Sequence, residues 1–184
     1  MSETKRLNTK TLSEISILLA LAAVLELIAM LLPRQPQGGS ISLSMLPVLI
    51  IAYRHGFKVG IFSGVAYAIL DMIISGFSFV GLHWGVVPLD YLLAYGVLGT
   101  SALIFRINRD SVAIFALGMF VAMMGRFFFH FLSGAILFGE YAPEGQPVPI
   151  YSILYNGAYM VPSIVLTLLI GVPIFIRLKE QLQS

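Results

Sequence analysis

Long apolar runs separated by short polar connections constrain the fold of this chain more than any other feature. Residues 111–138 hold no Asp, Glu, Lys or Arg except Arg126, and a helix needs about 20 predominantly apolar residues to cross a bilayer. Hydrophobic residues make up 58% of the 184 residues and charged residues only 11%, against about 25% charged in an ordinary soluble domain. The mean hydropathy is +0.92, and no run shows the alternation of a membrane barrel. The sequence therefore predicts an all-α integral membrane protein.

Six membrane-spanning helices in a single membrane domain, residues 1–184, explain these runs best. The predicted spans cover residues 12–32, 41–53, 59–76, 86–105, 111–138 and 150–176. The second span is short and contains Pro47, so a five-span alternative has to be weighed.

The distribution of basic residues decides between six spans and five. With six spans, one side of the membrane holds only Arg34, and the other collects nine basic residues: Lys5, Arg6, Lys10, Arg54, Lys58, Arg106, Arg109, Arg177 and Lys179. Such an excess of Lys and Arg is typical of cytoplasmic loops. We therefore expect a multi-pass protein of the cell membrane with both termini in the cytoplasm.

Several classes of function are excluded by what the sequence lacks. There is no cysteine, which excludes disulfides, iron–sulfur clusters and thiol zinc sites. No G-x-x-x-x-G-K-[ST] loop occurs, so any ATP hydrolysis must come from partner subunits, and neither an H-E-x-x-H nor a G-x-S-x-G motif is present. Only His83, His130 and Asp90 could meet on one side of the membrane. We expect no metal site, no catalytic site and, at a net charge of +2, no nucleic-acid partner.

Ionisable side chains inside the spans are the informative positions, because each costs about 2.5–3.5 kcal/mol at the centre of a membrane helix and normally faces a cavity or a partner. They are Glu14, Glu26, Asp71, Asp90, Arg126 and His130.

Three of the spans direct polar or aromatic groups toward the outer side. The "PLDYLLAY" stretch places Asp90 and Tyr91 about one turn inside the outer surface. The fifth span puts three residues at i, i+4 spacing on one face: His130, Gly134 and Phe138. The sixth span places polar and aromatic residues close together: Tyr151, Ser152, Tyr155, Asn156 and Tyr159. A carboxylate, an imidazole, an amide and aromatic faces suit a small, flat, nitrogen-rich ligand, including a cation.

A structural interpretation of each residue remains open at this stage. His130 would then be a buried histidine whose hydrogen bonds are all made within the protein, and Asn156 would hold two helices together by hydrogen bonds. The tyrosines would lie at the boundary between membrane and water. Arg126 is expected to pair with a carboxylate beneath the pocket, Asp71 being one candidate.

The first span carries small residues at Ser16, Ala20 and Ala23, which form one stripe on a helix. Such a stripe lets another helix approach closely. It would serve either packing within the chain or docking of another subunit.

Four stretches resemble the thiamine-specific substrate-binding (S) component of energy-coupling factor (ECF) transporters, the ThiT family: "PQGGSISLSMLP", "LDYLLAYGVLG", "RFFFHFLSGAILFGEYAPEG" and "IYSILYNGAYMVPS". The resemblance runs from about Glu14 to the end of the sixth span. It implies a six-helix protein that captures thiamine from outside with high affinity and docks, through the small-residue stripe of the first span, onto a transmembrane coupling subunit and two ATPases.

The resemblance also assigns roles to individual residues. The family's ligand-binding positions fall on Asp90, Tyr91, His130, Gly134, Phe138, Tyr151 and Asn156. A flexible lid is expected at Gln37, Gly38, Gly39 and Ser40. Some members have glutamate at the position of Asp90 and tryptophan at that of Phe138, and Arg126 is not expected to be a ligand.

The function that the resemblance implies is thiamine binding in an ATP-driven vitamin importer, with no cofactor besides the ligand. The same class of protein with another vitamin or a pyrimidine precursor as ligand is the first alternative. The others are a small intramembrane enzyme using His130 and Asp90 as an acid–base pair, and a structural bundle.

Overall fold

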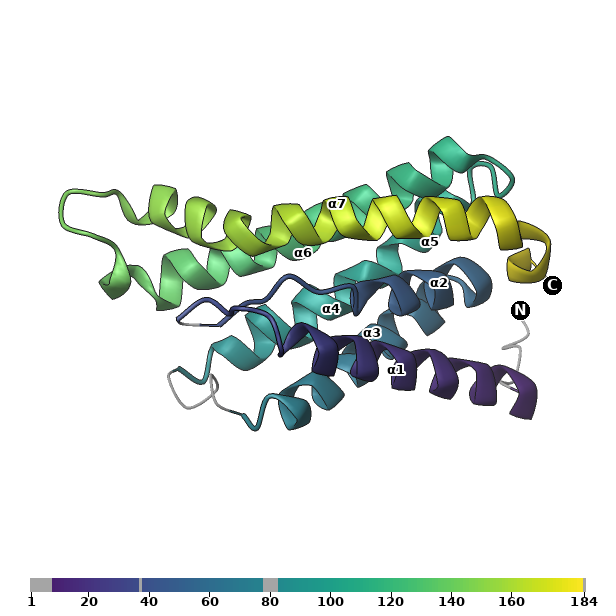
Figure 1. Cartoon of the computed structure of the whole chain (residues 1–184), viewed down its shortest axis with the longest axis horizontal. Helices are drawn as coiled ribbons and strands as arrows, with labels where there is room; N and C mark the ends of the chain where they lie inside the picture. The colour runs from purple at the N-terminus through teal and green to yellow at the C-terminus, as the bar shows by residue number, and fades with distance from the viewer. Residues whose placement is uncertain (1–7, 37, 78–82, 184) are drawn as a thin grey trace, which may run out of the picture.

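The computed structural model describes residues 8–36, 38–77 and 83–183, and within them the regular structure is helical throughout (Figure 1). The segments are α1 (Thr9–Ala29), α2 (Met45–His55), α3 (Phe57–Ile74), η1 (Val87–Leu93), α4 (Ala94–Gly96), η2 (Val97–Thr100), α5 (Ser101–Phe105), α6 (Val112–Leu137), η3 (Gly139–Tyr141) and α7 (Val148–Gln183). The segments from η1 to α5 form one continuous rod. The all-helical membrane fold predicted from the sequence is confirmed.

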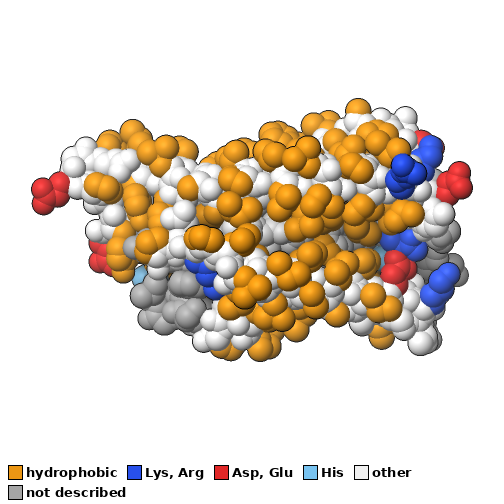
Figure 2. Space-filling view, viewed as in Figure 1, with side chains coloured by type: hydrophobic (Ala, Val, Ile, Leu, Met, Phe, Trp, Pro, Cys, Tyr) orange, Lys and Arg blue, Asp and Glu red, His pale blue; other side chains and the backbone are white. Residues whose placement is uncertain are grey.

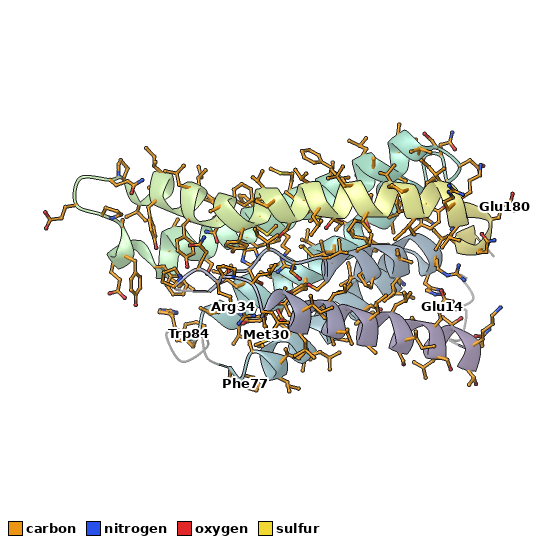
Figure 3. The ribbon with its side chains drawn as sticks, viewed as in Figure 1. Glu14, Met30, Arg34, Phe77, Trp84 and Glu180 are labelled. Carbon is orange, nitrogen blue, oxygen red and sulfur yellow. The ribbon has the colours of Figure 1, made fainter. Side chains whose placement is uncertain are left out.

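Five of the described helices are long and apolar enough to cross a membrane, and α2, at 11 residues, is shorter. In Figure 1, α1 begins and α7 ends at the same end of the bundle, as an even number of crossings requires. The longer connections lie at the opposite end, where Figure 3 labels Trp84 and Phe77, while Glu14 and Glu180 lie near the chain ends. Which end faces the cytoplasm stays a prediction.

The surface supports burial in lipid. Apolar side chains cover the middle of the face shown in Figure 2, and Lys and Arg side chains gather at the end that holds the chain ends. Leu31 is 85% exposed, Ile17 69% and Leu169 67%. Apolar side chains left open in this way are favourable only where lipid replaces water.

The second predicted span, 41–53, begins later in the structure than expected, and the sixth, 150–176, is longer, because α7 continues to Gln183. Helix α2 starts only at Met45 and continues to His55, whereas residues 41–43 are not helical. The reason is that serines in this stretch bind other elements: Ser42 Oγ donates to Glu26 Oε2 at 2.8 Å, and its backbone nitrogen donates to Ser163 Oγ at 3.1 Å. Pro47 lies in the first turn of α2, where its missing N–H leaves no helical hydrogen bond unmade.

The fourth crossing is irregular at its N-terminal end. Residues Val87–Leu93, which include Asp90 and Tyr91, form a π-helical turn, a geometry that is frequent at functional sites. The rest of the rod lies close against α3, because a Cβ at Gly64 would fall on the carbonyl oxygen of Tyr95 and one at Gly99 on the backbone of Ile61. Paired glycines of this kind let two membrane helices touch along their backbones, which fixes where the rod presents its outer turn.

The half of the bundle near the chain ends is closed by aromatic rings. Phe115 and Phe175 stack with centroids 4.2 Å apart, and the edge of Tyr53 packs on both of them at 5.3 and 5.5 Å. At the same end, Arg54 binds Glu14, which joins α1 to α2. These aromatic rings fill the interior of this half of the bundle.

Candidate functional site

A pocket opens in the half of the bundle that carries the long connections. It holds about 950 Å3 of space free of protein atoms, counting the open mouth. All seven side chains or glycines predicted to bind a ligand line it: Asp90, Tyr91, His130, Gly134, Phe138, Tyr151 and Asn156. The structure thus brings together residues from η1, α6 and α7 that lie up to 66 positions apart in the sequence.

Asp90 and His130 form the polar centre of this pocket. His130 Nδ1 lies 2.7 Å from Asp90 Oδ1, and Ser133 Oγ donates to Asp90 Oδ2. His130 is buried, at 7% exposure, and its second ring nitrogen also has a partner, since Arg126 Nε donates to Nε2 at 3.1 Å. The carboxylate is therefore held by one turn of α6, and each of its oxygens keeps a free lone pair for a ligand.

The predicted pairing of Arg126 with Asp71 is wrong for the part of the chain described, where no ion pair links the two. Instead, the Arg126 guanidinium lies over the ring of Tyr95, with Cζ 3.8 Å from the ring centroid. Tyr95 in turn donates its hydroxyl hydrogen bond to Asp71 Oδ2 at 2.6 Å. The aromatic ring separates the two charges, and Nη1 of Arg126 has no hydrogen-bond partner among the described residues. Arg126 also lines the pocket, together with Asp71.

Gly134 and Asn156 fix the contact between α6 and α7 beneath the pocket. A Cβ on Gly134 would collide with Ser152 Oγ and lie 2.9 Å from Asn156 Nδ2. Asn156 Nδ2 donates to the carbonyls of His130 and Ser152 at 3.1 and 3.0 Å, and Oδ1 accepts from the Tyr159 hydroxyl at 2.6 Å. The amide group of Asn156 therefore joins the two helices as well as lining the pocket, which is what the structural interpretation of this residue expected.

Aromatic rings cover the walls of the pocket. The rings of Tyr151 and Tyr155 lie 5.6 Å apart, and the edge of Tyr159 meets His130 at 5.8 Å. Phe138 and Tyr91 are also lining residues. Tyrosine and phenylalanine faces can stack on a flat ligand and attract a cation.

The predicted lid lies across the same pocket. Gln37 is outside the described residues, while Gly38, Gly39 and Ser40 line the cavity. Both glycines have positive φ, 105° and 99°, and the Tyr155 hydroxyl donates to the Gly38 carbonyl at 3.0 Å. A side chain at Gly39 would enter the ring of Tyr159, so this loop follows its path only because two glycines permit it.

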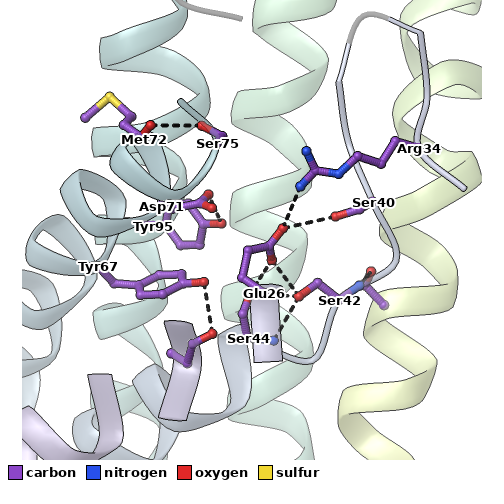
Figure 4. A network of polar contacts seen from close by, with 12 residues as sticks. Glu26, Arg34, Ser40, Ser42, Ser44, Tyr67, Asp71, Met72, Ser75 and Tyr95 are labelled. Carbon is purple, nitrogen blue, oxygen red and sulfur yellow. Dashed lines mark hydrogen bonds and ion pairs between the residues drawn. The ribbon is translucent and has the colours of Figure 1, made fainter. Parts of the chain in front are cut away.

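Glu26 lines the pocket, although no specific role was predicted for it from the sequence. Its carboxylate is 5% exposed and accepts from Arg34 Nη2 at 3.3 Å and from the hydroxyls of Ser40, Ser42 and Ser44 at 3.2, 2.8 and 3.2 Å (Figure 4). The sequence did hold a signal for this contact, because Glu26 is a carboxylate inside the first span and Arg34 is the single basic residue of the predicted outer loops. Glu26 fastens the loop after α1 to the helix before it.

The formal charge of the pocket favours a cation. Its lining includes three carboxylates and two guanidinium groups: Glu26, Asp71 and Asp90; Arg34 and Arg126. With His130 neutral, the formal charge is one negative unit, which a monovalent organic cation would balance.

The predicted docking stripe lies away from the pocket. Ser16 and Ala20 are exposed and Ala23 is half-buried, so packing within the chain does not occupy the first two. Among the described residues, no group of three or more His, Cys, Asp and Glu side chains could hold a metal ion.

Comparison with known proteins identifies the family. The sequence model described as "Thiamine transporter protein" (Thia_YuaJ) matches residues 12–183. The chain belongs to the thiamine transporter protein family. It is 31% identical to the thiamine transporter ThiT of Bacillus subtilis (strain 168) over an alignment of 193 residues, which covers 100% of this chain and 98% of the relative.

Two further comparisons agree with this assignment. The thiamine transporter ThiT of Lacticaseibacillus paracasei is 29% identical over 139 residues, 68% of each chain. A solved structure of ThiT from Listeria monocytogenes matches with a TM-score of 0.80 at 24% identity, covering 95% of this chain and 97% of the other, which shows the shared fold. The chain is thus a multi-pass transport protein of the cell membrane and not an enzyme, which sets aside the enzymatic alternative.

Proposed function

We propose that this chain is the thiamine-binding S component of an ECF-type importer. It captures thiamine from the outer side of the membrane and delivers it through a transmembrane coupling subunit and two ATPases. Membership of the thiamine transporter family and the names of the relatives support the ligand. The absence of a phosphate-binding loop in the sequence supports an ATPase supplied by partners.

The observation that carries the proposal is the Asp90–His130 pair at the centre of an aromatic pocket with a formal negative charge. Thiamine joins an aminopyrimidine, which offers amino hydrogens, to a positively charged thiazolium ring. Asp90 accepts from the aminopyrimidine, and the negative pocket attracts the thiazolium. Tyr91, Phe138 and Tyr151 stack on the two rings.

The lid acts by closing over the bound ligand. Gly38, Gly39 and Ser40 line the pocket mouth, and Gln37 belongs to the same loop in the sequence. Rearrangement of the glycines opens a path for thiamine, and closure shields the Asp90 contact from water, which strengthens it.

Isothermal titration calorimetry on the purified protein tests the proposal. The unmodified chain is expected to bind thiamine tightly, and Asp90→Asn is expected to weaken binding by on the order of tenfold to a hundredfold, the usual value of a hydrogen bond to a charged group. The matched control is Glu180→Gln, which also removes one carboxylate charge but lies exposed at the far end of the bundle (Figure 3). No heat with thiamine, or equal affinities for the two variants, would contradict the proposal.

Competition separates thiamine from the alternative ligands. Labelled thiamine bound to the protein should be displaced by unlabelled thiamine and not by an equal concentration of another vitamin or of the isolated aminopyrimidine. If one of those compounds displaced it at a lower concentration than thiamine does, that compound would be the ligand.

A further inference from the structure

Arg126 is held rigidly beneath the pocket by its neighbours. Its side chain is buried, at 8% exposure. The guanidinium lies over the ring of Tyr95, with Cζ 3.8 Å from the ring centroid, and Tyr95 is itself fixed by its 2.6 Å hydrogen bond to Asp71. The guanidinium therefore has little freedom to move away from the residue above it, which is His130.

The hydrogen bond from Arg126 determines where His130 carries its proton. All five N–H groups of a guanidinium donate and none accepts, so Nε2 of His130, 3.1 Å from Arg126 Nε, has to be the accepting nitrogen and is unprotonated. The other nitrogen, Nδ1, lies 2.7 Å from Asp90 Oδ1. An unprotonated Nδ1 would point a lone pair at a carboxylate oxygen, so the ring proton lies on Nδ1. The hydrogen bond at one histidine nitrogen thus sets the state of the other.

We propose that Arg126 is a positioning residue for the ligand site, which keeps His130 in its neutral, Nδ1-protonated form so that Asp90 stays fixed in place and no histidinium beside it cancels its negative charge. Without Arg126, Nε2 is free to take a proton. If the proton moved from Nδ1 to Nε2, the unprotonated Nδ1 would repel the Asp90 carboxylate and displace it. If both nitrogens were protonated, His130 would become a cation that cancels the charge of Asp90. Either change weakens the binding of a cation at Asp90. The histidine part of the inference stands on geometry alone, and the effect on a cationic ligand rests on the proposed function.

Nuclear magnetic resonance of the ligand-free protein tests the histidine directly. The full chain, labelled with nitrogen-15 in its histidine rings, gives correlations that distinguish protonated from bare ring nitrogens, and the His130 signals are those lost in His130→Gln. We expect a proton on Nδ1 and none on Nε2, and the appearance of a proton on Nε2 in Arg126→Met. A protonated Nε2 in the unmodified protein, or an unchanged pattern in Arg126→Met, would overturn the proposal.

A double-mutant cycle with thiamine tests the consequence for binding. Arg126→Met is expected to weaken thiamine binding by on the order of tenfold, whereas Arg126→Lys, which keeps a charged donor, should stay within about threefold of the unmodified protein. In an Asp90→Asn background, Arg126→Met should have almost no further effect, because the two residues act through one pair. Independent, additive losses would show that Arg126 acts elsewhere.

The resonance experiment and the double-mutant cycle test different claims, so one can contradict its claim while the other supports its own. The spectrum of the unmodified protein needs no ligand and only His130→Gln to assign it, and thermal unfolding of Arg126→Met shows whether its binding loss reflects the site or the fold. If His130 shows the expected proton pattern but thiamine does not bind, the proposed function is wrong and the role of Arg126 toward His130 stands.

Discussion

The residues of the site differ in how directly they serve a ligand. Asp90 keeps free lone pairs toward the pocket, whereas both nitrogens of His130 and the amide nitrogen of Asn156 are engaged within the protein. A substitution at Asp90 therefore changes ligand contacts, and one at Asn156 also loosens two helices. Loss of binding alone does not separate the two roles, so stability has to be measured beside affinity.

Gly134→Ala should destabilise the protein because the added methyl group collides with Ser152 Oγ and crowds Asn156. We expect a loss of about 1–3 kcal/mol in the free energy of unfolding, as for other overpacked sites, together with weaker thiamine binding. Thermal unfolding and calorimetry in the same detergent measure both. Gly157→Ala is the matched control on the neighbouring helix, since its Cβ meets nothing closer than 4.0 Å; an equal loss in both variants would refute the packing argument.

The spacing of residues along the sequence predicted that Asp90, His130 and Asn156 lie together in the pocket, but it did not predict the contacts of Glu26. Asp90, His130 and Asn156 lie on regular or nearly regular helices, where i, i+4 spacing places side chains on a face. Glu26 was missed because its partners Ser40, Ser42 and Ser44 lie in or next to an irregular segment, and no periodicity gives the path of such a segment. The direct pairing of Arg126 with Asp71 was wrong because the ring of Tyr95 lies between them.

At the scale of elements, the segment between α1 and α2 both binds Glu26 and lines the pocket. Its serines bind Glu26 and its glycines line the pocket, so the carboxylate of α1 holds the loop that we propose as the lid. The sequence predicted part of this segment as helix because its apolar residues continue into α2. The extended path wins because three serine hydroxyls and Arg34 bind Glu26.

Glu26→Gln should therefore open the loop more often. The neutral amide keeps the size of the side chain but weakens its hydrogen bonds to Arg34 and the serines, so we expect thiamine to dissociate on the order of tenfold faster. Stopped-flow displacement of bound thiamine measures this rate. Glu14→Gln, on the same helix at the other end of the bundle (Figure 3), is the control; equal rates for Glu26→Gln and the unmodified protein would show that Glu26 does not hold the loop.

Helix α1 also carries the predicted docking stripe. Ala20 is exposed, and a large side chain there would prevent close approach of another helix. Ala20→Trp is expected to bind thiamine normally and to lose thiamine uptake in cells that hold the complete transporter. Leu21→Trp, one position around the helix on another exposed face, should keep uptake. Normal uptake by Ala20→Trp would move the docking surface elsewhere.

At the scale of the whole molecule, the fold places the pocket at one end of the bundle and the chain ends at the other. The all-helical membrane fold could be predicted because lipid permits only helices and closed barrels, whose backbone hydrogen bonds are all made internally. The gathering of both chain ends at one end of the bundle could be predicted because basic residues mark one side. The depth and shape of the pocket could not, since they depend on the π-helical turn at Asp90 and on the glycine contact between α3 and the fourth crossing.

The orientation can be measured with single cysteines, because the natural chain has none. A reagent that does not cross membranes should label Glu144→Cys, in the exposed loop before α7, on intact cells, and should label Glu180→Cys, near the end of α7, only after the cells are opened. The reverse pattern would place the pocket mouth toward the cytoplasm and contradict capture from outside.

The most direct test of the central claim is a crystal structure of the protein with thiamine. The account predicts thiamine in the pocket between η1, α6 and α7, with its aminopyrimidine within hydrogen-bonding distance of an Asp90 carboxylate oxygen and its rings against Tyr91, Phe138 or Tyr151. Thiamine bound outside this pocket, or inside it without contact to Asp90, would contradict the account.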